Sequence, residues 1–162
     1  SDVCSSDLHN RAVGSAPGTI RISQRRADDM NFVSAEGDGV TVEMTTLDDL
    51  AGDLGSIDLL KIDVEGFEKF VLEGAPRTLA AARNVYIELF DENFARYGYG
   101  SREILDRLEA AGFACLTVQP DGSLRAGEPD TTLCLNVLAT RDASDLERRG
   151  FRMPASVKYS GA

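Results

Sequence analysis

A strand pattern, a carboxylate-rich turn and a helix pattern follow one another near the middle of the chain, and this succession constrains the fold more than any other feature. The apolar run over residues 57–62 predicts a parallel strand that is buried on both faces. Apolar residues at helical spacing follow over residues 67–74. Asp63 and Glu65 therefore lie where a strand ends and a helix begins. Ligands of doubly wound sheets bind outside the carboxyl ends of the strands, so we expect these carboxylates to face a cleft.

The remaining patterns alternate between strands and helices, which predicts an α/β fold with a mostly parallel sheet and an antiparallel edge. Residues 40–45 alternate apolar and polar side chains, as a half-buried strand does. Thr46 is placed to cap a short helix through Leu50, and Ser101 is placed to cap a helix that Gly112 ends. The other expected elements are extended segments at 12–14 and 19–22, a helix at 76–82, a strand at 84–89, a loop at 90–100, strands at 114–118 and 134–139, and a short helix at 144–149.

The composition fits one globular domain and argues against two classes of partner. The 162 residues are 43% hydrophobic and 27% charged, which is ordinary for a domain that buries a sizeable core. The net charge of -10 opposes attraction to phosphate backbones, so we expect no nucleic-acid partner. No window approaches the roughly 18 apolar residues that a membrane span needs. The sequence does not predict an oligomeric state.

The cysteines predict neither a disulfide framework nor a zinc site. Cys115 and Cys134 have no closely spaced Cys or His partner, and we interpret both as small apolar residues on strands. The pattern of a secretory signal peptide is not recognisable, so we expect a reducing, cytoplasmic location.

A longer motif runs through the central region. Residues 61–68 read Lys-Ile-Asp-Val-Glu-Gly-Phe-Glu, and residues 71–75 read Val-Leu-Glu-Gly-Ala. Three further pieces occur in order, namely Thr-Leu-Asp-Asp-Leu at 46–50, Val-Tyr-Ile-Glu at 85–88, and a helix pattern at 105–113 that ends in Ala-Ala-Gly-Phe. Together these pieces resemble the FkbM family of S-adenosylmethionine-dependent methyltransferases. The resemblance implies a Rossmann-like methyltransferase fold and methyl transfer to an oxygen, commonly on sugars, glycolipids or secondary metabolites.

The chain departs from the family pattern on its N-terminal side. A strand with a glycine-rich turn and a following acid-tipped strand, which in the family hold the methionine and ribose parts of the cofactor, are not recognisable. Residues 1–8 resemble the translated end of a common sequencing adapter, and we expect them to be an assembly artefact; a natural polar tail is the alternative. We therefore expect a partial methyltransferase domain at 9–141 and an extension at 142–162. Most cofactor contacts would then lie in a missing N-terminal part, and the fragment alone would be inactive.

Methyl transfer to a hydroxyl needs a base that takes up the proton, and four residues are candidates for this chemistry. Asp63 and Glu65 are candidates for the base and for hydroxyl positioning, and Asp63 is also a possible cofactor contact. Alternatively, Glu65 interacts with the N-terminus of the following helix while Asp63 only orders the turn. Glu88 ends the next predicted strand and is expected to converge on the same edge. Lys61 can contact a substrate anion, pair with Asp63 or Glu88, or extend its ammonium into solvent.

The same acids can alternatively form a metal site, although the motif assigns no metal ligand. Asp63 and Glu88, with Asp91 or Asn93 from the next segment, offer the oxygen ligands that Mg²⁺ prefers. Two rivals therefore stand beside the O-methyltransferase. One is a metal-dependent α/β transferase or hydrolase that uses Asp63, Glu65 and Glu88, and the other is a non-catalytic methyltransferase-like module.

Two groups of side chains near the motif are interpreted as structural. Glu68, Lys69 and Glu73 are expected on a solvated helix face, where Lys69 can pair with the carboxylates four residues to either side. The aromatic residues within 90–99 can form a wall over an acceptor, but core packing is favoured for most of these rings. His9 is the only histidine, so we expect no histidine base.

Overall fold

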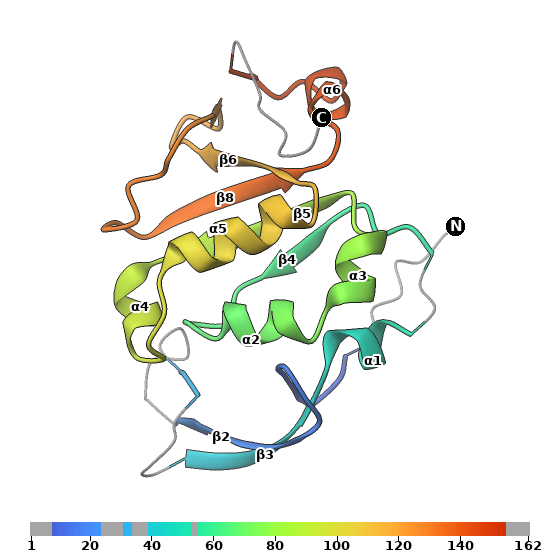
Figure 1. The fold of residues 1–162 in the computed structure, drawn as a ribbon, viewed down its shortest axis with the longest axis vertical. Coiled ribbons are helices and arrows are strands. Elements are labelled where there is room, and N and C mark those ends of the chain that lie inside the picture. The colour runs from blue at the N-terminus through green and yellow to red at the C-terminus, as the bar shows by residue number, and fades with distance from the viewer. Residues whose placement is uncertain (1–7, 24–30, 34–38, 53–54, 155–162) are drawn as a thin grey trace.

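The computed structural model describes residues 8–23, 31–33, 39–52 and 55–154, and its described part has an α/β fold with two sheets (Figure 1). Residues 1–7, which hold most of the predicted artefact, lie outside the described residues. The expected boundary between residues 141 and 142 stays a prediction.

The smaller sheet comes from the N-terminal part of the chain. β3 (Gly39–Thr45) lies in its centre, parallel to β1 (Ala12–Val13) and antiparallel to β2 (Gly18–Ser23). These strands confirm the expected extended segments. The sheet is joined to the rest of the molecule by α1 (Leu47–Ala51), which Thr46 caps as predicted by accepting a hydrogen bond from the Asp49 N–H at 3.1 Å.

The larger sheet has five strands, and most neighbouring strands are antiparallel. β4 (Leu60–Ile62) runs parallel to β5 (Asn84–Leu89), as predicted. β8 (Leu135–Thr140) lies between β5 and β6 (Ala114–Val118) and is antiparallel to both, while β7 (Leu124–Arg125) pairs with β6 at the far edge. The prediction of a mostly parallel sheet is therefore wrong, because the sheet is mixed.

The path of the chain explains why the sheet is mixed. Parallel neighbours need a crossover connection, and α2 (Glu68–Glu73) and α3 (Pro76–Ala81) supply it between β4 and β5. Two further helices, α4 (Asp91–Ala95) and α5 (Ser101–Ala110), carry the chain from β5 to β6. The chain then returns along β8 in the opposite direction. Because β8 lies between β5 and β6, it pairs with both strands in the antiparallel sense.

Strand β4 is less buried than its apolar sequence predicts. Leu59 precedes β4 and is 56% exposed, and Lys61 within β4 is exposed as well. Only Ile62 is buried, and it packs in the main core. Burial on both faces is therefore a wrong prediction for this strand, since in the described part of the chain β4 is an edge strand that pairs with β5 alone.

The helices match the predicted positions, with two differences around residues 90–101. The expected loop contains the short helix α4, and Ser101 begins α5 instead of capping it. Asp91 in α4 takes the place of a capping side chain at the start of α5. Its Oδ1 atom accepts hydrogen bonds from the Ser101 N–H at 2.8 Å and from the Ser101 hydroxyl at 2.7 Å.

Apolar side chains form two clusters on the larger sheet. The main cluster includes residues of α2, α3, α5 and the facing sides of β5 and β8. The smaller cluster lies on the other side and brings α6 (Ala143–Arg148) against the sheet; its buried members are Leu116, Leu124, Leu138 and Leu146. Adjacent β8 residues Val137 and Leu138 belong to different clusters, as the alternation of a strand requires.

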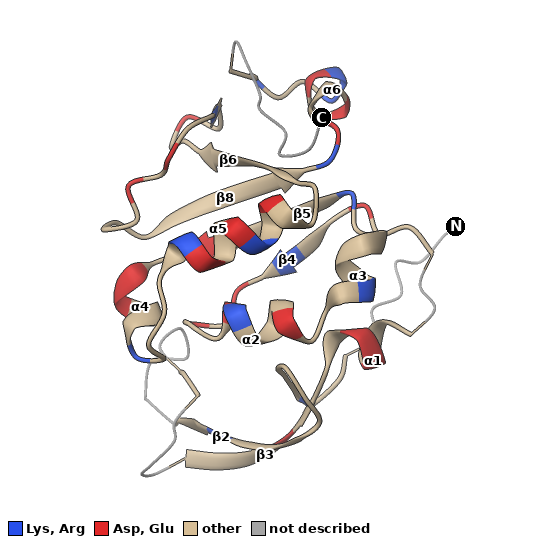
Figure 2. Ribbon diagram, in the orientation of Figure 1, with Lys and Arg blue, Asp and Glu red and all other residues tan. Residues whose placement is uncertain are grey.

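Acidic and basic residues are interspersed along α5 (Figure 2). None of the helices in the described part of the chain has both the length and the apolar character to cross a bilayer.

Candidate functional site

The turn between β4 and α2 carries two of the predicted site residues in an unusual backbone conformation. Glu65 has a φ of 52° and Gly66 has a φ of 98°. Glycine adopts such angles freely, but a glutamate in the left-handed region is strained. Strained residues of this kind are concentrated at functional sites, where the surrounding structure holds them.

Contacts from the segment after β5 hold this turn. The Tyr99 hydroxyl donates a hydrogen bond to the Gly66 carbonyl oxygen at 2.7 Å, and the Asn93 side-chain amide donates to Glu65 Oε2 at 3.1 Å. A Cβ atom on Gly66 would lie 2.8 Å from the Asn93 carbonyl oxygen and 2.9 Å from the Tyr97 ring. The segment therefore lies so close to the turn that only glycine fits at this position.

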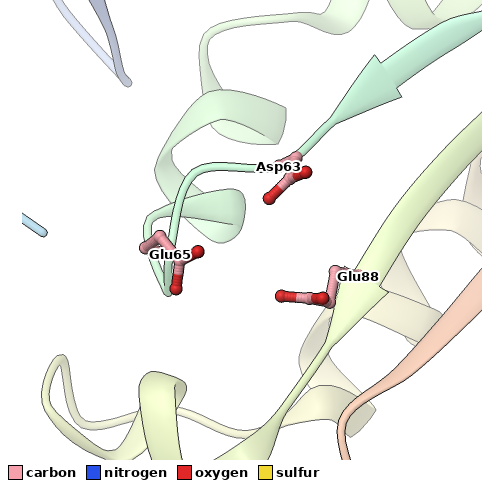
Figure 3. A group of neighbouring side chains, drawn as sticks. All are labelled: Asp63, Glu65 and Glu88. Atoms are coloured by element: carbon pink, nitrogen blue, oxygen red, sulfur yellow. The ribbon is translucent and has the colours of Figure 1, made fainter. Parts of the chain in front are cut away.

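Three carboxylates converge beside the turn. One oxygen from each of Asp63, Glu65 and Glu88 lies within 4.8 Å of the other two. Figure 3 shows the first two reaching from the turn toward Glu88 on β5. Strand register explains the approach, because Ile62, the last residue of β4, pairs with Ile87, and the residue that follows each of them in the sequence is one of these acids. The expected convergence of Glu88 with Asp63 is thus present in the fold.

The environment of Glu65 favours its protonated form. Burial raises its pKa most, and the neighbouring Glu88 and Asp63 carboxylates raise it further, while the hydrogen bond from Asn93 acts in the opposite direction. A general base works best when its pKa lies near the working pH, so this shift makes Glu65 a better base at neutral pH than an ordinary glutamate.

Lys61 supplies a positive charge next to this group. Its ammonium lies 2.8 Å from Asp63 Oδ2, although the side chain is largely exposed. The hydrogen bond to Asp63 and the charge of that carboxylate raise the pKa of Lys61. Pairing with Asp63 was one of the expected interactions for Lys61, while contact with a substrate anion stays a prediction.

Cys134 also borders the carboxylates, which the sequence did not indicate. Its thiol donates a hydrogen bond to Glu88 Oε1 at 3.1 Å, and the residue is exposed just before β8. Desolvation and the nearby Glu88 carboxylate raise the pKa of the thiol to about 11, so it stays protonated at neutral pH. The interpretation of Cys134 as a small apolar residue on a strand is wrong, because the residue is exposed and precedes β8. Only the pairing of β8 with β5 brings it to this position.

Asp91 and Asn93, the further metal candidates, have other contacts. Asp91 accepts hydrogen bonds from Ser101 and, through Oδ2, from the Thr131 hydroxyl at 2.5 Å. Asn93 donates to Glu65. Among the acids of the described residues, Asp63, Glu65 and Glu88 form a group whose oxygens suit a hard cation, and a metal contact from Asn93 stays a prediction.

Two predictions about helix α2 are wrong. Glu68 is buried, with 2% of its surface exposed, instead of lying on a solvated face. Lys69 pairs with Glu103 of α5 at 2.7 Å, and not with a carboxylate four residues away. Both differences have one cause, because α5 and the segment before it cover the side of α2 that helical spacing assigns to solvent.

The aromatic residues before α5 mostly pack in the core, as favoured. Phe94 and Tyr99 are buried and stacked, with ring centroids 4.8 Å apart. Tyr97 is half-buried and donates a hydrogen bond to the Val33 carbonyl oxygen at 2.8 Å. These rings therefore support the turn and the N-terminal segment.

Comparisons with known proteins show which family the sequence resembles. The model of the methyltransferase FkbM domain matches residues 4–115. A curated protein from Sinorhizobium fredii, 2-O-methyltransferase NoeI, is 34% identical over 93 residues, which are 56% of this chain and 38% of that protein. The match thus spans well under half the length of this relative. No solved structure is significantly similar to the chain.

Proposed function

The chain belongs to the FkbM methyltransferase family, and from this premise we propose that it takes part in S-adenosylmethionine-dependent methyl transfer to a hydroxyl of a sugar, glycolipid or secondary metabolite. The observation that carries the proposal is the convergence of Asp63, Glu65 and Glu88 beside the ends of β4 and β5. The relative NoeI is a 2-O-methyltransferase, which supports an oxygen acceptor.

The charge of the site fits a cationic cofactor. Three carboxylates lie together, and Lys61 pairs with only one of them, Asp63. The excess negative charge suits the sulfonium and ammonium groups of S-adenosylmethionine, and Asp63 is the residue that we propose as a cofactor contact. When bound, the cofactor supplies the methyl group, and its sulfur retains the electron pair of the broken C–S bond.

The protein's own task is to orient the acceptor and remove its proton. We propose that Glu65 or Asp63 takes up the proton of the acceptor hydroxyl, because both carboxylates lie at the turn and Glu65 has a raised pKa. A carboxylate base of this kind typically contributes about 10² to 10⁴ in rate. Glu88 and Lys61 complete the proposed catalytic group, Glu88 by holding the acceptor hydroxyl and Lys61 by fixing Asp63 through their ion pair.

One specific observation favours a second candidate, a metal-dependent transferase or hydrolase. The grouped oxygens of the three acids suit Mg²⁺, which proteins bind through one or two carboxylates and water. A non-catalytic methyltransferase-like module is the third possibility, since the family match concerns sequence and not turnover. The three functions differ in what they require, so one set of assays separates them.

The test uses the full-length gene product, with methyl-labelled S-adenosylmethionine and a panel of glycans, glycolipids and hydroxylated metabolites. Label transfer to an acceptor hydroxyl that persists in EDTA is the expected result. Transfer that requires Mg²⁺ would add a metal to the mechanism. Metal-dependent hydrolysis without S-adenosylmethionine would select the second candidate, and binding without turnover would select the third.

A further inference from the structure

Glu68 is a buried acid that the proposed chemistry does not use. It begins α2, and only 2% of its surface is exposed. Its side chain folds back along the chain, and Oε1 accepts a hydrogen bond from the Val64 N–H at 3.2 Å. Oε2 is buried and has no hydrogen-bond partner among the described residues. Burying a carboxyl oxygen without a partner costs free energy, so the presence of Glu68 at this position calls for an explanation.

The surroundings of Glu68 make it an unusual acid. Burial raises its pKa to about 7, although the backbone N–H groups of Glu68, Val64 and Gly66 act in the opposite direction. The titratable groups near it are Glu88 on β5 and, from the segment after α4, Tyr97 and Tyr99. None of these neighbours carries a compensating positive charge. Among the described residues, the carboxyl therefore accepts a hydrogen bond and has no ion-pair partner.

That hydrogen bond acts on the residue between the two proposed catalytic acids. Val64 lies between Asp63 and Glu65, so fixing its N–H fixes the peptide plane that joins it to Asp63. Glu65 is the next residue in the chain and has the strained backbone conformation, and this strain persists only while neighbouring contacts hold it. Glu68 supplies its contact at the start of the turn, and Asn93 supplies another at the Glu65 side chain.

We propose that Glu68 is a positioning residue, whose carboxyl oxygen holds the Val64 N–H and thereby keeps Asp63 and Glu65 directed at Glu88. This proposal rests on the proposed function of the three acids. It differs from a purely structural role, in which Glu68 would only fill space in the core beneath the turn.

Two substitutions separate the hydrogen bond from the volume of the side chain. Glu68→Gln keeps an acceptor oxygen and loses the acid, whereas Glu68→Met keeps a similar volume and loses the acceptor. Because methionine is similar in volume to glutamate, Glu68→Met creates no large cavity. Because methionine is apolar, the substitution also removes the unpaired buried oxygen, so the fold should survive. Val71→Ala is the control, since it truncates a buried residue of the same helix away from the turn.

The measurement is hydrogen exchange and the ¹⁵N spectrum of the labelled chain. In Glu68→Met we expect the Val64 N–H to exchange about tenfold faster or more, and the Asn93 side-chain amide signals to move toward solvent-exposed values. The amide of Leu72, within α2, should change much less. Glu68→Gln should keep the wild-type pattern, and Val71→Ala should speed exchange throughout α2 without singling out Val64.

Unchanged Val64 exchange and unchanged Asn93 signals in Glu68→Met would overturn the proposal. Equal acceleration in Val71→Ala would also overturn it, because the effect would then be general loss of stability. These readouts need no substrate. Failure to detect methyl transfer by the full-length gene product would therefore count against the proposed function alone, while the amide pattern would still decide the role of Glu68.

Discussion

The Asn93 side-chain amide donates a hydrogen bond to Glu65 Oε2 at 3.1 Å, across 28 positions of the sequence. This contact joins the segment after β5 to the strained turn after β4. It stabilises the ionised form of Glu65, so it lowers the pKa of a carboxyl that burial and neighbouring acids raise. The contact therefore helps to orient the proposed base, and it opposes part of the rise in the pKa of Glu65 that burial and the neighbouring acids cause.

Asn93→Ala should raise the pKa of Glu65 further, because the ionised carboxylate loses its donor. Carboxyl ¹³C chemical shifts followed against pH measure this change. Asn84→Ala is a matched control, since Asn84 donates to the Asp58 carbonyl oxygen at 2.9 Å, at the other end of β5. A pKa of Glu65 that is the same in wild type and Asn93→Ala would mean that the hydrogen bond does not persist in solution.

Asp63→Asn should lower methyl-transfer turnover of the full-length gene product at least about tenfold, because a neutral amide cannot accept a proton. Folding should be preserved, since Asp63 is an exposed residue and its ion pair with Lys61 is of a kind that contributes little to stability. Steady-state kinetics beside a thermal melt measure both effects. Asp58→Asn, the same change at an exposed position before β4, should leave turnover unchanged. Turnover near the wild-type value in Asp63→Asn would remove Asp63 from the mechanism.

Gly66→Ala should destabilise the protein more than Gly98→Ala does. Both glycines have positive φ, at 98° and 73°, so each alanine meets backbone strain of roughly 1–2 kcal/mol. A methyl group on Gly66 would also collide with the Asn93 carbonyl oxygen and the Tyr97 ring, while nothing lies within 4 Å of the same position on Gly98. Urea unfolding midpoints measure the difference. Equal losses would show that the turn and the following segment are not in close contact.

Asp48→Ala should cost about 0.5–2 kcal/mol, the usual range for loss of a helix cap. Its Oδ1 accepts hydrogen bonds from the Thr78 N–H at 2.7 Å and the Thr78 hydroxyl at 2.8 Å, and its Oδ2 accepts from the Arg77 N–H at 3.0 Å. The buried Asp48 thus caps α3 from α1, a helix that lies earlier in the sequence. Asp49→Ala, at the exposed neighbouring position, is the control and should cost little.

The same cap should give the protein a specific acid sensitivity. Burial alone would raise the pKa of Asp48, but the hydrogen bonds from Arg77 and Thr78 outweigh it and lower the pKa below the ordinary value. The stability from Asp48 is therefore fully present above the ordinary Asp pKa of about 3.9 and is lost as the pH falls through the lower folded value. Unfolding free energies measured between pH 7 and 3 should fall more steeply in wild type than in Asp48→Ala. Parallel curves would contradict this role.

Local patterns predicted most elements of the fold correctly. The strand predicted at residues 84–89 matches β5, the Thr46 cap is formed, and the apolar spacing after Gly66 matches α2. Such patterns record which side of an element faces apolar surroundings, and this information is local to the chain. The acids at the end of β4 were found for the same reason, because a change of periodicity marks the end of a strand.

Long-range packing decided the features that the sequence did not predict. Glu68 has the spacing of a solvent-facing helix residue, but segments near α5 cover it and its side chain bonds to Val64. Cys134 reaches Glu88 only because β8 inserts between β5 and β6. That insertion is also what makes the sheet mixed.

The sequence by itself therefore determined the elements, the family resemblance and the position of the acid-bearing turn. The tertiary structure alone decided the strand order, the contact of Cys134 with Glu88, and the burial of Glu68. The physical reason is that a repeat of two or 3.6 residues specifies which face of an element is buried. It does not specify which distant segment covers that face, or in which register two strands pair.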